Sequence, residues 1–130
     1  MADPLHVELV AADRLVWSGE ANMVIARTTE GDIGVLPDHA PTLSLMVDGV
    51  VEVTTDNNEV WVAAVDAGFL SVADNRVSVL SEHAEMSHEI DLEKARHELE
   101  RAQQAGEHDE EAQEAVRRAQ ARIRAVERAQ

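Results

Sequence analysis

The pattern of hydrophobic and polar positions divides this chain into two parts. Up to residue 80, short apolar runs with a period of two recur about every ten residues, beginning with Leu5 to Leu9 and ending with Val77 to Val79. A period of two is typical of half-buried strands, because successive side chains point to opposite faces of a sheet. Turn signals such as Asp48-Gly49 and Asp74-Asn75 separate the runs. We therefore expect an all-β sandwich or flattened barrel of about 8–10 short strands.

From Glu82 onward, alanine, glutamate, glutamine and arginine dominate, with one glycine and no proline. Asp91 and Asp109 predict helix N-caps, and Gly106 predicts the end of the first helix. Overall we predict an α+β chain, with a β-sandwich domain over 1–86 and an antiparallel two-helix hairpin over 87–130. The two helices are expected at about 91–105 and 109–128.

The apolar stripes of these two helices are thin. They consist of Leu92, Ala95, Leu99, Ala102 and Ala105 in the first helix, and of Ala112, Ala115, Val116, Ala119, Ile123 and Val126 in the second. Burying an alanine contributes on the order of 1 kcal/mol or less, whereas ordering a residue costs about 1 to 2 kcal/mol. The hairpin is therefore expected to be marginally stable alone and able to detach.

Charge is distributed unevenly over the 130 residues, whose net charge is −15. Residues 1–90 hold three arginines against sixteen acidic residues, whereas 115–130 hold five arginines against one glutamate. The acidic body repels phosphate backbones, so nucleic acid is not an expected partner. The basic set is Arg117, Arg118, Arg122, Arg124 and Arg128. These arginines form either a solvated helix face or a contact for acidic groups, on a partner or on the chain's own body. The thin stripe favours contact with another molecule.

Residues for catalysis or metal binding are sparse. The six histidines form no His-x-His or His-x-x-x-His pair. Asp38 and His39 lack the context of a nucleophile elbow, and Gly31-x-x-Gly34 is too short for a phosphate loop. Neither a catalytic residue nor a metal site is expected, so the chain is not predicted to be an enzyme. It contains no cysteine, which suits a reducing cytoplasm. No signal peptide is recognised, and no apolar run approaches the roughly 20 residues of a membrane span.

The segment from Gly31 to Pro41 is the most distinctive of the sequence. Gly31 predicts a tight turn with positive φ, and Gly34 predicts a place where another backbone approaches closely. A short strand is expected at Ile33 to Leu36, followed by a loop that Pro37 and Pro41 make stiff. Such a loop is either a corner of the fold or a contact surface.

Three segments together carry a resemblance to a known family. They are Trp17-Ser18-Gly19, the run Gly31-Asp32-Ile33-Gly34-Val35-Leu36-Pro37-Asp38-His39-Ala40-Pro41, and Ala67-Gly68-Phe69-Leu70-Ser71-Val72 with Asn75, Val77, Val79 and Leu80 after it. The second is similar to the signature Gly-(Glu/Asp)-x-Gly-x-x-Pro-x-His-x-Pro. In this order, and with the terminal hairpin, they make the chain resemble the epsilon subunit of F-type ATP synthases over essentially its full length. Ala67 departs from the glycine that many members have there.

The resemblance implies a non-catalytic rotor subunit of the central stalk. Its partners would be the gamma subunit, the membrane ring of c subunits and, through the C-terminal helices, the alpha/beta catalytic head. It would couple proton-driven rotation to the head, and its helices would restrain ATP hydrolysis. Membrane association, at the cytoplasmic face of the cell membrane, would come only through the complex. The residues implied to face the ring are Glu30, Gly31, Asp32 and His39. The rival interpretation is a free-standing β module that binds a small ligand under a helical lid.

Some members of that family bind ATP through an (Ile/Leu)-Asp-x-x-Arg-Ala motif. The matching residues here are Ile90, Asp91, Lys94 and Ala95. Lys94 replaces the arginine and lacks its bidentate fork. Two interpretations stay open: a weak regulatory ATP site, or a plain N-cap at Asp91, which is the simpler one. No other cofactor is expected.

Overall fold

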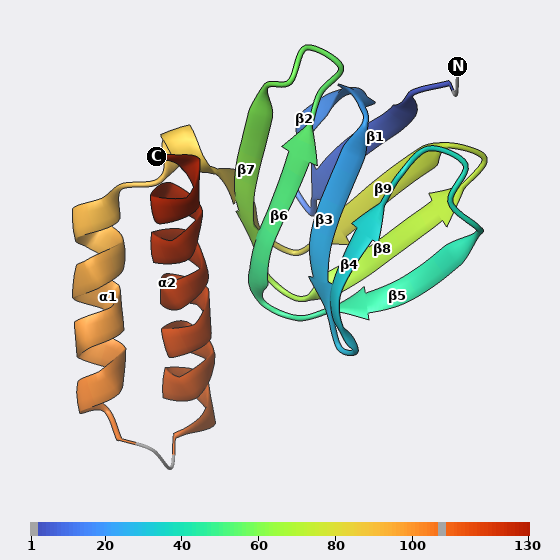
Figure 1. Cartoon of the computed structure of the whole chain (residues 1–130). Helices are drawn as coiled ribbons and strands as arrows, with labels where there is room; N and C mark the ends of the chain where they lie inside the picture. The colour runs from blue at the N-terminus through green and yellow to red at the C-terminus, as the bar shows by residue number, and fades with distance from the viewer. Residues whose placement is uncertain (1–2, 107–108) are drawn as a thin grey trace.

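The computed structural model describes residues 3–106 and 109–130 (Figure 1). Its strands are β1 (Leu5–Ala11), β2 (Arg14–Ala21), β3 (Met23–Thr28), β4 (Gly31–Val35), β5 (Thr42–Met46), β6 (Gly49–Thr54), β7 (Val60–Val65), β8 (Gly68–Ala73), β9 (Arg76–Ser81) and β10 (Ala84–Met86). They are followed by a 3₁₀ turn η1 (Ser87–Glu89) and helices α1 (Leu92–Gln104) and α2 (Glu110–Ala129). The predicted β-sandwich with a C-terminal helical hairpin is confirmed.

The strands form two layers that share one continuous sheet. One layer runs β10-β7-β6-β3, with β4 added on β3, and the other runs β5-β8-β9-β1-β2. The layers join where β3 meets β5 at Thr28 and Met46. At the opposite edge, Arg14 Nη2 of β2 donates a hydrogen bond to the Ala84 carbonyl of β10 at 3.3 Å. The sandwich is therefore a nearly closed barrel, and its described ladders are antiparallel except for β1 with β9.

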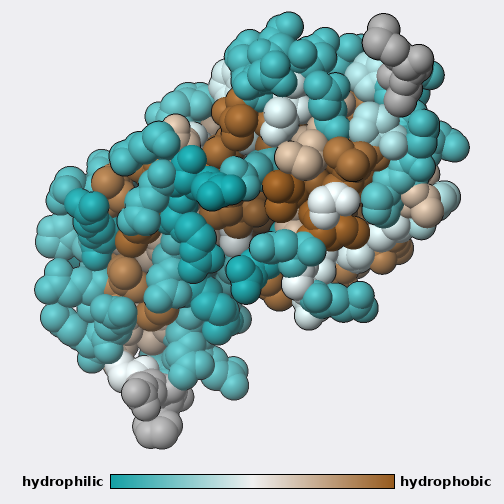
Figure 2. Space-filling model, viewed as in Figure 1, coloured by the Kyte–Doolittle hydropathy of each residue, from teal (hydrophilic) through white to brown (hydrophobic). Residues whose placement is uncertain are grey.

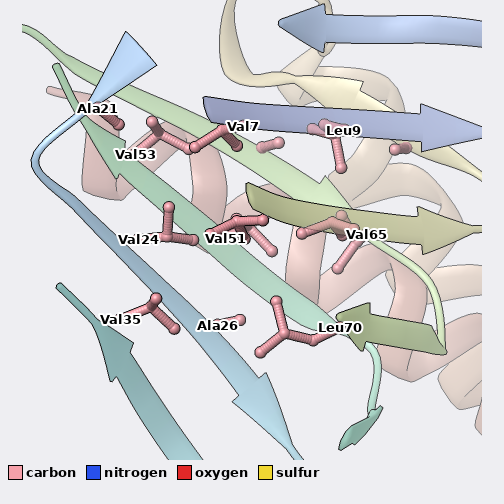
Figure 3. Close-up of a cluster of buried hydrophobic side chains, with 14 of the residues drawn as sticks. Val7, Leu9, Ala21, Val24, Ala26, Val35, Val51, Val53, Val65 and Leu70 are labelled. Atoms are coloured by element: carbon pink, nitrogen blue, oxygen red, sulfur yellow. The ribbon is translucent and has the colours of Figure 1, made fainter. Parts of the chain in front are cut away.

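The core lies between the two layers, where alternate side chains of each strand meet (Figure 3). Its largest fully buried members are leucines and valines from both layers: Leu5, Leu9, Leu70, Val7, Val24, Val35, Val51, Val72, Val77 and Val79. Burying each of these contributes about 1.5–3 kcal/mol. The β domain is thus stabilised independently of the hairpin.

Strand β7 is buried on both faces. Ala63 and Val65 face the core between the layers, whereas Val62 and Ala64 face outward and pack against Ala121 and Ala125 of α2. The predicted stripe of α2 omitted these two alanines, because it took the helix to have one apolar face. In the structure α2 lies between α1 and the sheet (Figure 1), and its buried residues include Ala112 and Ala119 besides the two alanines that pack on β7. Figure 2 shows the apolar side chains between the helices as a line enclosed by hydrophilic ones.

The glycine predictions had mixed outcomes. Gly31 adopts φ +112°, as expected for its turn, although the strand covers Gly31–Val35 rather than Ile33 to Leu36. The expected close approach at Gly34 is wrong, because a Cβ there would meet no atom within 4 Å. Gly68 is the crowded one: a Cβ at this position would overlap the backbone carbonyl of Leu80 on β9. Only glycine therefore fits where β8 leaves its turn.

Candidate functional surfaces of the sheet and the hairpin

Four of the five arginines in the basic set of α2 make ion pairs with the β domain. The two tightest are Arg122 Nε to Glu85 Oε1 at 2.7 Å and Arg128 Nε to Glu52 Oε1 at 2.8 Å. Both lengths are those of charge-assisted hydrogen bonds. Glu85 belongs to β10 and Glu52 to β6, so the pairs bracket the helix across the sheet. The chain's own acidic body, one of the two partners that the charge pattern left open, binds these four arginines here, and their use between molecules stays a prediction. Arg124 lines a groove next to Arg128.

The other two pairs surround the turn that follows β7. Arg117 Nε lies 3.6 Å from Asp48 Oδ2, and Arg118 Nε lies 3.5 Å from Asp66 Oδ2. Arg122 also reaches Asp66, with 3.8 Å between Nη1 and Oδ1. The Asp66 side chain is only 7% exposed. Its burial raises the pKa of the carboxyl above the usual range, although Arg122 and Arg118 both lower it.

The first residues after the β domain are fixed to the sandwich. Glu89 of η1 accepts a hydrogen bond from Arg14 Nη2 of β2 at 3.2 Å and another from the backbone N–H of Met86 at 3.0 Å. The bond from Arg14, followed by that from Met86, lowers the pKa of Glu89. The ring of His88 contacts Trp61 edge-on, with centroids 6.1 Å apart. The start of the hairpin is therefore attached to β2 and β7, which no pattern in the sequence indicates.

Asp91 is an N-cap, as predicted. Its Oδ1 accepts a hydrogen bond from the backbone N–H of Lys94 at 3.1 Å. With Ile90 and Ala95 these residues line a cleft of about 60 Å³, well below the several hundred Å³ typical of ligand pockets. The cleft in this docked arrangement is thus too small for ATP, and ATP binding stays a prediction. Within 3–106 and 109–130, no group of three or more His, Cys, Asp or Glu side chains that could hold a metal ion was found.

The four residues predicted to face a ring do not form one cluster. Glu30, Gly31 and Asp32 lie at the turn between β3 and β4, whereas His39 lies in the loop beyond the far end of β4. Gly31 and Asp32 are themselves the first two residues of β4, and the five residues of this strand span about 13 Å from that turn to the loop. The loop with His39 is attached to the β8–β9 turn. The backbone N–H of Asp38 donates a hydrogen bond to Asn75 Oδ1 in that turn, with 2.6 Å between the two atoms.

One outer face carries a row of exposed apolar side chains that the sequence analysis missed. Leu45 of β5 is paired with Phe69 of β8, Phe69 with Leu80 of β9, Leu80 with Val10 of β1, and Val10 with Leu15 of β2. The four larger side chains are 46–57% exposed. Each occupies an outward position of its own strand, and only the sheet register brings them together. We call these five residues the apolar row.

A β-sandwich with a docked helical hairpin on one outer face and an apolar row on the other defines a small two-part contact protein. Residues 4–87 match the family model described as "ATP synthase, Delta/Epsilon chain, beta-sandwich domain". The chain is 55% identical over 126 residues to the ATP synthase epsilon chain of Streptomyces avermitilis, covering 97% of this chain and 98% of that one. It is 48% identical to that of Rhodococcus jostii, covering 96% and 98%. The chain belongs to the epsilon chain family of ATP synthases.

Solved structures agree with this assignment. A chain of the mitochondrial ATP synthase of Euglena gracilis aligns with TM-score 0.78 and 26% identity, covering 97% of this chain and 81% of that one. A chain from the central stalk and c-ring of Tetrahymena thermophila ATP synthase, at 13% identity and TM-score 0.57, shares the fold. The protein is a rotor subunit of the central stalk, and the free-standing ligand-binding module is not favoured. It is a component of a membrane-associated complex; none of its described helices has the length and apolar character needed to cross a membrane.

Proposed function

We propose that this chain couples rotation of the c-subunit ring to the catalytic head by binding the gamma subunit, at the cytoplasmic face of the membrane and without catalytic chemistry of its own. The observation that carries the proposal is the apolar row. Contiguous exposed apolar patches on soluble proteins mark contact surfaces, because water disfavours them. The gamma subunit is the occupant we propose for the row, since family membership puts the chain in the central stalk.

The position of the row suits a permanent contact. It lies on the outer face of the β5-β8-β9-β1-β2 layer, whereas α2 covers the outer face of the other layer. Movement of the hairpin would therefore leave the row undisturbed. Burying the exposed half of a leucine or phenylalanine contributes about 1 kcal/mol. Four such side chains supply several kcal/mol of association.

Replacing Phe69 by aspartate tests this assignment. Phe69 is 48% exposed and lies in the row between Leu45 and Leu80. The charge should weaken binding of the full chain to purified gamma by about tenfold or more, while the isolated variant keeps its unfolding temperature. Val60→Asp is the matched control, because Val60 is 55% exposed but lies on β7, outside the row. Equal binding by Phe69→Asp and the control would refute the assignment of gamma to this face.

The ring contacts and the hairpin complete the proposal. The turn with Glu30, Gly31 and Asp32 and the loop with His39 are proposed as two separate contacts with the ring, since β4 keeps them apart. Helix α2 is proposed to leave the sheet and bind the alpha/beta head, where it restrains ATP hydrolysis. Its docking on Val62, a few alanines and partly exposed ion pairs supports this, because such contacts are individually weak.

A further inference from the structure

Asp66 stands out among the charged groups under α2. Its side chain is 7% exposed, and within the described part of the chain its Oδ2 has no hydrogen-bond partner. The two arginines that face it are 3.5 and 3.8 Å away, longer than the 2.7–2.9 Å of a good charge-assisted bond. Arg118 Nε is itself buried without a hydrogen bond. The carboxylate is therefore desolvated but poorly compensated.

We propose that Asp66 opposes the docking of α2, and so sets how readily the helix leaves the sheet. A buried ion pair stabilises a contact only when its geometry is good, since otherwise the loss of hydration exceeds the Coulomb attraction. When α2 leaves, water reaches Asp66 and the penalty disappears. This inference deepens the proposed regulatory role of the hairpin and rests on it.

Glu85 provides the contrast that makes the idea testable. It also pairs with Arg122, but at 2.7 Å and with its side chain 36% exposed. It keeps more of its hydration than Asp66 does and its hydrogen bond is good, so it should favour docking. Removing the charge of Asp66 leaves neither arginine without a partner, because Arg122 keeps Glu85 and Arg118 keeps Glu114 at 3.4 Å. Two carboxylates around one arginine are thus expected to have opposite effects.

The isosteric change Asp66→Asn removes the charge and little else. The ordering hydrogen bonds of this residue come from its backbone: Asp66 N–H donates to the His83 carbonyl at 3.0 Å, and Ser81 Oγ donates to the Asp66 carbonyl at 2.8 Å. Both survive in the variant, which should therefore fold. Glu85→Gln is the matched change at the well-formed pair.

Hydrogen exchange of α2 amides in the isolated full chain measures docking. The undocked hairpin is marginal, so its amides exchange when α2 is released, and amides of β7 report global stability. Asp66→Asn should raise the protection of α2 about tenfold, and Glu85→Gln should lower it. Unchanged or lower protection in Asp66→Asn would overturn the proposal, since Glu85→Gln shows in the same assay that docking is detected.

The pH dependence gives a second readout. The groups facing the Asp66 carboxyl are Arg118 and Arg122 of α2, Asp48 of the β5–β6 turn and His83 of the β9–β10 turn. Since the docked state raises the pKa of Asp66, it binds that proton more tightly than the released state does. Protonation of Asp66 therefore favours docking, and docking of α2 in the wild type should weaken as pH rises through that pKa. The difference in α2 protection between wild type and Asp66→Asn separates the effect of Asp66 from that of the other titrating groups. This difference should shrink in acid, where Asp66 is neutral. A difference that does not vary with pH would also count against the proposal. Neither measurement involves the ATP synthase complex, so their failure would leave the coupling proposal standing.

Discussion

The ion pairs of α2 predict that removing the negative charges of Asp48 and Glu85 strengthens the inhibition of ATP hydrolysis. Arg117, Arg118 and Arg122 bind the chain's own acids in the docked state, so they are not available to the catalytic head. Reversing the charge of these arginines would remove their contacts with the sheet and with the head at once, so it cannot separate the two. Changing their acidic partners on the sheet affects the contact with the sheet alone. The double variant Asp48→Asn with Glu85→Gln should release α2 with its arginines intact, and ATP hydrolysis by the assembled enzyme should fall.

The size of the effect follows from the geometry of the two pairs. Glu85 and Arg122 are 2.7 Å apart with side chains 36% and 17% exposed, and Asp48 and Arg117 are 3.6 Å apart with side chains 11% and 54% exposed. Asp48 differs from Asp66 in that its carboxylate also accepts a short backbone hydrogen bond, so its burial is better compensated. After solvent screening, such pairs contribute about 0.5–1 kcal/mol each. Losing both changes the equilibrium between docked and released α2 by about tenfold. The β domain should stay folded. Asp48 Oδ1 accepts a hydrogen bond from Ala67 N–H at 2.8 Å, and the amide oxygen introduced by Asp48→Asn can accept the same bond.

The assay is ATP hydrolysis by the reconstituted complex at matched subunit content. The double variant should hydrolyse ATP several-fold more slowly than the wild type wherever the released helix limits activity. A chain that lacks 115–130 is the control: it should hydrolyse faster than the wild type, and adding the double substitution to it should change nothing. Unchanged or faster hydrolysis by the full-length double variant would refute the view that the sheet and the head compete for α2.

Three further predictions concern the remaining sites. Asp32→Lys and His39→Glu should each impair proton-driven ATP synthesis, and their effects should add because β4 separates them; normal synthesis by the double variant would contradict a ring contact. Asp91→Ala should lower the free energy of unfolding by about 1 kcal/mol, while calorimetry with millimolar ATP should show no heat; clear binding that Lys94→Arg strengthens would contradict this. Glu89→Gln should destabilise the fold at neutral pH but not in acid. The lowered pKa of Glu89 means that its contribution is present above the unfolded pKa and is lost as pH falls through the folded value, so parallel curves of unfolding temperature against pH would contradict it.

The fold could be predicted from the sequence because its signals are local. Alternation within a strand, Asp91 and Asp109 as caps, and positive φ at Gly31 and Gly106 each depend on a few neighbouring residues. The close backbone approach was assigned to Gly34, but it occurs at Gly68. Both are glycines near a turn, so local sequence does not distinguish them. The backbone of Leu80 approaches Gly68 because of the register of β8 with β9, and register is a long-range property.

The functional surfaces were less predictable for the same reason. The arginines of α2 were expected to form either a solvated face or a contact, with contact to another molecule favoured. The sequence could not show that Glu52 and Glu85, from strands far apart in the chain, would meet them. The apolar row has a similar origin, because each member looks like an ordinary outward residue of its own strand. Burial of Asp66 also escaped prediction, since it directly follows β7 in a sequence typical of a turn.

The two outer faces of the sandwich differ in how strongly they can hold a partner, and this difference fits a subunit that must both stay attached and switch. Under α2 the apolar seam consists of Val62, Ala64, Ala121 and Ala125, with Val50 and Ile90 partly buried against it. Together these side chains contribute several kcal/mol at most. Asp66 subtracts from this and the exposed ion pairs add a little. The net docking free energy is therefore a few kcal/mol, so an acidic surface offering comparable pairs can shift α2 from one site to the other. The apolar row has no such opposing charge among its members, and a partner bound there gains with every side chain that it covers.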